Sequence, residues 1–144
     1  MAWLEAVWFV RRRMRLQINA SVLFQRCLAC HVFGIVVGGL LYLTGIGAMN
    51  SVLLTMATLG ILLLCIRREF WPMAVSGALV STVLYTLVLK AALTIWPPLI
   101  TAWTEVNLWG LGFWGMPLEE IVWAFLYCPV WGLSTAYMFD ARLE

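Results

Sequence analysis

Charged residues are scarce in this sequence. Asp, Glu, Lys and Arg make up 11% of its 144 residues, and Lys90 is the only lysine. Soluble globular proteins carry about 25% charged residues. Hydrophobic residues make up 64%, more than a chain of this length can bury in a core of its own. The composition therefore excludes an ordinary water-soluble domain. The net charge of +2 is also too small to indicate nucleic-acid binding.

Four mostly apolar runs are close to the length of about 20 residues that a helix needs to cross a bilayer. The predicted spans cover residues 28–46, 51–66, 73–96 and 117–139. Helices are required because backbone polar groups inside a membrane must be satisfied without water. The sequence thus predicts an all-α integral membrane protein with about four transmembrane helices, forming a single domain over residues 1–144 whose partner is the lipid bilayer.

Residues 1–20 have a different pattern. Trp3 and Trp8 stand close to Arg11, Arg12 and Arg13. Such a mixture is typical of an amphipathic helix that lies in the interface, with aromatic rings at the acyl boundary and arginines among headgroups. A basic flank that only orients the first span is the alternative.

Arginine is absent from two predicted connections, residues 47–50 and 97–116. The arginines instead precede the first span, follow the second and follow the fourth. An even number of spans places all of them on one side, which the positive-inside rule identifies as the cytoplasm. We therefore expect a bacterial inner-membrane protein with both termini cytoplasmic. The outer loop 97–116 is rich in Trp, which favours the membrane–water interface.

Two adjacent carboxylates, Glu119 and Glu120, follow Pro117 at the start of the fourth predicted span. Proline suits the first turn of a helix, and acidic residues there meet the positive end of the helix dipole. That structural role is sufficient to explain them. The alternative is that one carboxyl faces the bundle, because ionisable groups at membrane depth are costly and usually functional. A buried carboxyl can act as a proton donor.

The segment around these glutamates resembles a known family. Its letters are NLWGLGFWGMPLEE over residues 107–120, followed by IVWAFLYCP over 121–129. This order resembles the lycopene cyclase domain, the small membrane-embedded type found in heterodimeric or fused carotenoid cyclases. RREFWP at residues 67–72 resembles the family's entry to the preceding helix. The resemblance covers residues 67–139, about half of the chain.

The resemblance implies an activity and a site. Cyclases of this type protonate the terminal double bond of an acyclic carotenoid, and the carbocation closes a ring and loses a proton. Glu119 or Glu120 would be the acid, and Asn107 would support the site. Aromatic side chains would contact the carotenoid or stabilise the cation. Packing against lipid or in the core is the alternative explanation for them. These aromatic candidates are Trp114, Trp123 and Tyr127.

The sequence departs from the family at one position. The family commonly carries an acidic residue late in the helix before the Asn loop, where this chain has Lys90. Lys90 could form an ion pair with a glutamate, or extend to the outer interface. The family also normally needs two copies of the domain, and this chain holds one.

The chain's single histidine belongs to a second motif, Cys27-Leu-Ala-Cys30-His31. The letters match the attachment pattern of c-type haem. Cys27, Cys30 and His31 could also hold a metal, together with Cys65. We expect neither, because haem is attached outside the cytoplasmic membrane and this motif lies at the cytoplasmic end of the first span. A helix face of small residues explains the motif, and no cofactor is required.

Two functional hypotheses remain open. The first is a cyclase half that acts on a carotenoid within an oligomer. The second is a non-catalytic transmembrane subunit of a larger pigment-binding, photosynthetic or electron-transfer complex. Small-residue faces at Gly34 and Gly38, and at Gly77 and Ser81, allow helices to approach closely. They could serve internal packing or a partner subunit.

Overall fold

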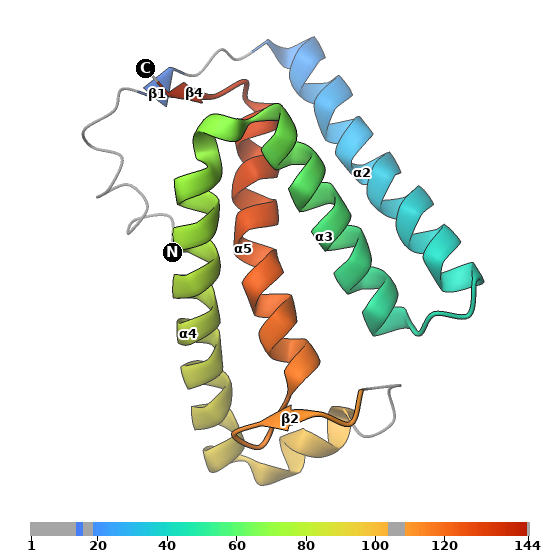
Figure 1. Ribbon diagram of the computed structural model, residues 1–144, viewed down its shortest axis with the longest axis vertical. Coiled ribbons are helices and arrows are strands. Elements are labelled where there is room, and N and C mark those ends of the chain that lie inside the picture. Colours follow the sequence, from blue (N-terminus) through green and yellow to red (C-terminus); the bar gives the residue numbers. More distant parts are fainter. Residues whose placement is uncertain (1–13, 16–18, 104–108, 144) are drawn as a thin grey trace.

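A computed structural model of the chain describes residues 14–15, 19–103 and 109–143. Four long helices dominate it (Figure 1). They are α2 (Ala20–Leu43), α3 (Ala48–Ile66), α4 (Trp71–Ile95) and α5 (Leu118–Met138). Each is long and apolar enough to cross a membrane. The predicted fold class is therefore confirmed.

The first helix begins eight residues before the predicted start of its span. Asn19 caps it, and its side-chain oxygen accepts a hydrogen bond from the backbone N–H of Ser21 at 3.1 Å. Such a cap satisfies one of the free N–H groups of the first turn. Residues 20–27 are too polar for a membrane span by composition, because they include Gln25 and Arg26. The helix nevertheless continues through them.

Short 3-10 turns connect the elements at both ends of the bundle. Arg67 ends α3, and the turn η1 (Arg68–Phe70) leads directly into α4. Proline in the first turn of α4 loses no hydrogen bond, because the first N–H groups of a helix have no partner within it. After α4, the turn η2 (Pro97–Trp103) begins the long connection to α5.

The bundle is arranged around α5, which lies between α4 and α3, while α2 lies outermost beside α3 (Figure 1). The tightest core sits at one end, between α3, η1, α4 and α5. It consists of Leu63, Phe70, Ala74, Leu133, Ala136 and Ala141. Much of the remaining surface is apolar, and large side chains such as Ile35 and Leu43 on α2 are exposed. A surface of this kind is compatible with lipid as its solvent.

Two short ribbons flank the helices. β1 (Met14–Arg15) pairs antiparallel with β4 (Arg142–Leu143), and β2 (Gly112–Phe113) pairs with β3 (Met116–Pro117). Met14 and Arg15 are thus extended, so the helix predicted over residues 1–20 does not continue through them. Its other residues before 19 lie outside the described part of the chain.

The β1–β4 ribbon places both ends of the described chain at one end of the bundle (Figure 1), as an even number of spans requires. We call it the arginine end, because Arg15, Arg26, Arg67, Arg68 and Arg142 lie there. The opposite end is the loop end, which holds η2 and the β2–β3 hairpin.

The small-residue faces have different roles. Gly77 and Ser81 are buried in α4, and the Ser81 hydroxyl donates to the Ala124 carbonyl of α5 at 2.9 Å. A Cβ added to Gly38 would lie 3.2 Å from Thr55 Oγ1, so α2 approaches α3 closely there. A Cβ at Gly34 would meet no atom within 4 Å. The face with Gly77 and Ser81 therefore serves packing between α4 and α5. The face with Gly34 and Gly38 serves packing between α2 and α3 only at Gly38.

Candidate functional site

The two glutamates at the start of α5 face different surroundings. Glu119 is completely buried. Its Oε1 accepts a hydrogen bond from the backbone N–H of Trp109, whereas its Oε2 has no partner among the described residues. Glu120 is half-buried, and its Oε2 accepts a hydrogen bond from the Tyr85 hydroxyl of α4 at 2.6 Å. Successive helical residues point about 100° apart, which explains why the neighbours separate in this way.

Trp109 joins the end of the connection between α4 and α5 to the helices of the bundle. Besides its backbone bond to Glu119, its indole N–H donates to Asn50 Oδ1 of α3 at 2.6 Å. Leu118 N–H also donates to the Leu111 carbonyl at 3.0 Å. Glu119, Trp109 and Asn50 thus form a chain of contacts from α5 through the loop to α3, which we call the loop latch.

The loop latch leads to a prediction. Asn50→Ala removes the acceptor of the Trp109 indole, so we expect the segment from residue 109 to 117 to exchange its amide hydrogens faster. The loss of one such hydrogen bond corresponds to about 1 kcal/mol, which is about a fivefold change in local opening. Hydrogen–deuterium exchange with mass spectrometry measures it. Thr58→Ala on the same helix is the control, because its hydroxyl donates to the Leu54 carbonyl of the same helix. Equal exchange in both variants would show that Asn50 does not hold the loop.

Lys90 contacts the hairpin rather than the buried carboxyl. Its Nζ donates to the Trp114 carbonyl at 3.2 Å and lies 5.7 Å from the centre of the Trp114 ring. The sequence left open whether Lys90 pairs with a glutamate or extends to the outer interface. Among the described residues it does not pair with Glu119, whose Oε1 is bonded to the Trp109 N–H and whose Oε2 has no partner. Trp114 and Gly115 both have positive φ, 56° and 79°, as the type I′ turn of a two-residue hairpin requires. Trp114, a candidate substrate contact, thus forms its cation–π contact with Lys90.

Four aromatic side chains form a continuous series beside Glu120. Tyr85 and Trp123 have ring centres 5.5 Å apart, Trp123 and Tyr127 are stacked at 4.7 Å, and Tyr127 and Trp131 are parallel at 6.3 Å. We call Tyr85, Trp123, Tyr127 and Trp131 the aromatic column. Residues four apart on a helix lie one above the other, which aligns the three members on α5. Its outer side is open, since Tyr127 is 44% and Trp131 67% exposed.

The sequence identified only part of this column. Trp123 and Tyr127 were expected on or near the face of Glu120. In the structure Trp123 packs against Tyr85, the hydrogen-bond partner of Glu120, and Tyr127 stacks on Trp123 one turn further on. Trp131 continues the same spacing and could have been found by extending it one turn. Tyr85 lies 35 residues from Glu120 in the sequence, so no local pattern could have revealed it. Asn107 lies outside the described residues.

Cys27, Cys30 and His31 do not converge on one point. Cys27 Sγ lies 3.6 Å from His31 Nδ1, which is also 2.8 Å from the Cys27 carbonyl. In this second contact the His31 ring N–H donates to the backbone carbonyl one turn earlier in the helix, which is common for a histidine in a helix. Cys30 is buried, whereas His31 is exposed. Among the described residues, no three His, Cys, Asp or Glu side chains are grouped to hold a metal ion.

The arginine end contains a charged cluster that the sequence did not reveal. Asp140 follows α5 and accepts hydrogen bonds from Arg67 and, at 3.0 Å, from Arg26. Arg26 also donates to the Tyr137 carbonyl at 2.8 Å. Asp140 thereby links α2, the end of α3 and the end of α5. The hydrogen bonds from Arg67 and then Arg26 lower the pKa of Asp140 from 3.8 to about 2.

The lowered pKa of Asp140 has a consequence for stability. A group whose folded pKa lies below its unfolded value stabilises the fold above the unfolded value and loses this contribution as the pH falls. We expect the contribution to be complete above about pH 5 and to disappear toward pH 2. Unfolding of wild type and Asp140→Asn in neutral lipid, followed from pH 6 to pH 2, measures it. The variant should be less stable at pH 6, and the difference should narrow with acid. A difference that stays constant would contradict this role.

Comparison of the chain with protein-family models, curated proteins and solved structures finds no match.

Proposed function

We propose that this chain is a lycopene cyclase-like membrane protein that closes the end group of an acyclic carotenoid by acid catalysis, as part of an oligomer. The observation that supports this most is the Tyr85–Glu120 hydrogen bond at the head of the aromatic column. A carboxyl group there adjoins a ring-lined surface that is open to lipid, where an apolar polyene would dissolve. Between the two glutamates, this arrangement favours Glu120 as the acid.

The proposed step is an isomerisation. Glu120 transfers its proton to one carbon of the terminal double bond, whose electron pair forms the new C–H bond and leaves a cation on the other carbon. A neighbouring double bond attacks the cation and closes the ring. A C–H proton then leaves to restore a double bond and is returned to the carboxylate. The faces of Trp123 and Tyr127 would stabilise the cation, by about 0.5–2 kcal/mol for each favourable contact.

Tyr85 and Glu119 support the acid in different ways. The Tyr85 hydroxyl donates to Glu120 Oε2 at 2.6 Å and holds the carboxyl group at the head of the aromatic column. Glu119 is fully buried, so no substrate can lie beside it. Its Oε1 accepts the backbone N–H of Trp109 within the loop latch. Lys90 bonds the Trp114 carbonyl, so it does not compete for the Glu119 carboxylate.

The test is expression in lycopene-accumulating cells, alone and together with a second cyclase-like half, with chromatography of the extracted pigments. Ring-containing carotenoids support the proposal. Unchanged lycopene in both cases, with the protein present in the membrane, overturns it.

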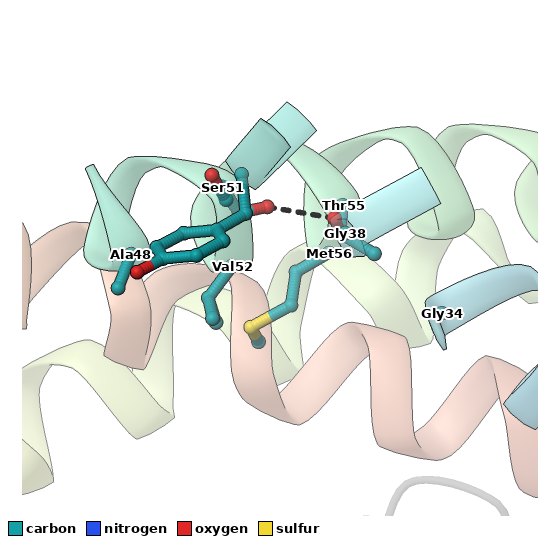
Figure 2. A pocket seen from close by; sticks show the side chains of 8 residues that line it. Gly34, Gly38, Ala48, Ser51, Val52, Thr55 and Met56 are labelled. Carbon is teal, nitrogen blue, oxygen red and sulfur yellow. Dashed lines mark hydrogen bonds between the residues drawn. The ribbon is translucent and has the colours of Figure 1, made fainter. Parts of the chain in front are cut away.

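A second candidate is a non-catalytic transmembrane subunit of a larger pigment-binding or electron-transfer complex. It is favoured by α2, the most exposed of the four helices, and by a groove of about 300 Å³ between α2 and α3 (Figure 2). The groove is lined by Gly34, Gly38, Tyr42, Ala48, Ser51, Val52, Thr55 and Met56. Purification from the native membrane in mild detergent should then yield a stoichiometric assembly. Recovery as a free homo-oligomer would count against it.

We also propose that the arginine end lies in the cytoplasm of a bacterial cell. The described arginines are all at that end, and Lys90 is the only described basic residue at the loop end. A fluorescent protein fused after residue 144 should fluoresce, and alkaline phosphatase fused there should be inactive. The opposite pair of results would reverse the orientation.

A further inference from the structure

Positive charge accumulates at the arginine end beyond what the protein itself neutralises. Five described arginines lie there, against two described acidic residues, Glu69 and Asp140. Arg26 and Arg67 share the carboxylate of Asp140, and Arg67 lies 3.9 Å from Glu69. Both available carboxylates are thus taken up by the same pair of arginines.

Arg68 and Arg142 have no such partner among the described residues. Both side chains are exposed. The two elements that carry them, β4 with Arg142 and η1 with Arg68, lie beside each other. Like charges on neighbouring elements repel each other, and an anion bound by Arg68 and Arg142 would offset this repulsion.

The position along the membrane normal identifies the source of that anion. Arg68 lies in the tight turn between two spanning helices, α3 and α4, and so at the membrane surface. Trp71, three residues further on, is 59% exposed. An exposed indole at a helix end marks the level of the headgroups. At that level the anions that surround a membrane protein are the phosphates of its lipids.

We propose that Arg68 and Arg142 form a binding site for the phosphate group of an anionic phospholipid. The guanidinium group matches phosphate because its planar N–H groups can donate two parallel hydrogen bonds. The site is independent of the cyclase proposal, since it lies at the other end of the bundle from Glu120.

The test compares spin-labelled phosphatidylglycerol with spin-labelled phosphatidylcholine for association with the full chain in liposomes. Wild type should prefer the anionic lipid, and each arginine removed should lower the preference about fivefold, from about 1 kcal/mol per charge near a membrane surface. Arg68→Gln with Arg142→Gln should therefore abolish most of it. Lys90→Gln, which removes a positive charge at the loop end, is the matched control and should leave it unchanged.

Four outcomes would overturn the proposal. One is a double glutamine variant that keeps the wild-type preference, and another is a Lys90→Gln variant that loses as much as the double variant. The third is an anionic-lipid preference that 50 mM inorganic phosphate abolishes at constant ionic strength, which would assign the site to the free ion. Arg68→Lys with Arg142→Lys keeps both charges and guards against misfolding. It should retain a clear preference, and failure to do so while the protein remains helical and inserted would also contradict the electrostatic site.

Discussion

Glu120→Gln should lower the yield of ring-containing carotenoid by a factor of about 100 or more in cells that supply lycopene. A positioned general acid contributes about 10²- to 10⁴-fold to a rate. Glutamine has the shape of glutamate but no acidic proton to transfer. Pigment chromatography, normalised to the amount of chain in the membrane, measures the ratio. Glu69→Gln removes a carboxylate at the opposite end of the bundle and should leave the yield unchanged.

The variant Glu119→Gln provides a comparison for Glu120→Gln, because the two glutamates are expected to affect the yield in different ways. Glu119→Gln should also reduce the yield, but through the loop latch, because it replaces the carboxyl group that accepts the Trp109 N–H. Faster amide exchange in residues 109–117 should accompany that loss. In Glu120→Gln the exchange of this loop should remain close to wild type. If Glu120→Gln retained full activity while Glu119→Gln lost it without any change in the loop, the assignment of the two roles would be reversed.

Leu63→Ala should destabilise the bundle far more than Leu62→Ala. Leu63 is 2% exposed and belongs to the core at the arginine end, whereas Leu62, the preceding residue on the same helix, is 44% exposed. Truncating a buried leucine leaves a cavity and costs about 2–5 kcal/mol in soluble proteins. In a bilayer the lower end of that range, about 2 kcal/mol, applies, because the unfolded reference also lies in hydrocarbon. Lipid fills the space left by Leu62, so its loss should cost about 0.5 kcal/mol or less.

Unfolding in bilayer-like micelles by added denaturing detergent compares the two leucine variants directly. The pair is matched in chemistry, helix and depth, so the difference reports packing alone. Equal destabilisation would mean that the face of α3 with Leu63 is not directed toward α5 and η1.

The sequence was sufficient to predict the four spans, for a simple physical reason. A helix needs about 20 apolar residues to cross a bilayer. This requirement concerns one continuous stretch of the chain, so it can be recognised directly in the sequence. The starts of α3, α4 and α5 fall within three residues of the predicted positions. The helix α2 begins eight residues before the predicted span, because Arg26 does not need to stay outside the helix. Its charge is neutralised by Asp140, 114 residues away.

The candidate site was only partly predictable for the same reason. Glu119 and Glu120 stand out as charges in an apolar chain, but which of them is buried depends on how α5 is rotated against α4 and α3. The contacts Tyr85–Glu120 and Asn50–Trp109 join residues 35 and 59 positions apart. No periodicity within one helix contains that information. Lys90 is a further example. The sequence offered a glutamate as its partner, but in the structure Lys90 donates to the Trp114 carbonyl, whose position depends on the folded hairpin.

The most direct test of the proposed chemistry uses the purified chain in liposomes loaded with lycopene, with no other protein present. Glu120 acting as an acid beside the aromatic column predicts a ring-containing product with the same molecular mass as lycopene, because the reaction is an isomerisation. Glu120→Gln in the same liposomes should leave lycopene intact. Complete recovery of lycopene from liposomes with inserted wild type, both in this experiment and after a second cyclase-like half is added, would contradict the proposal.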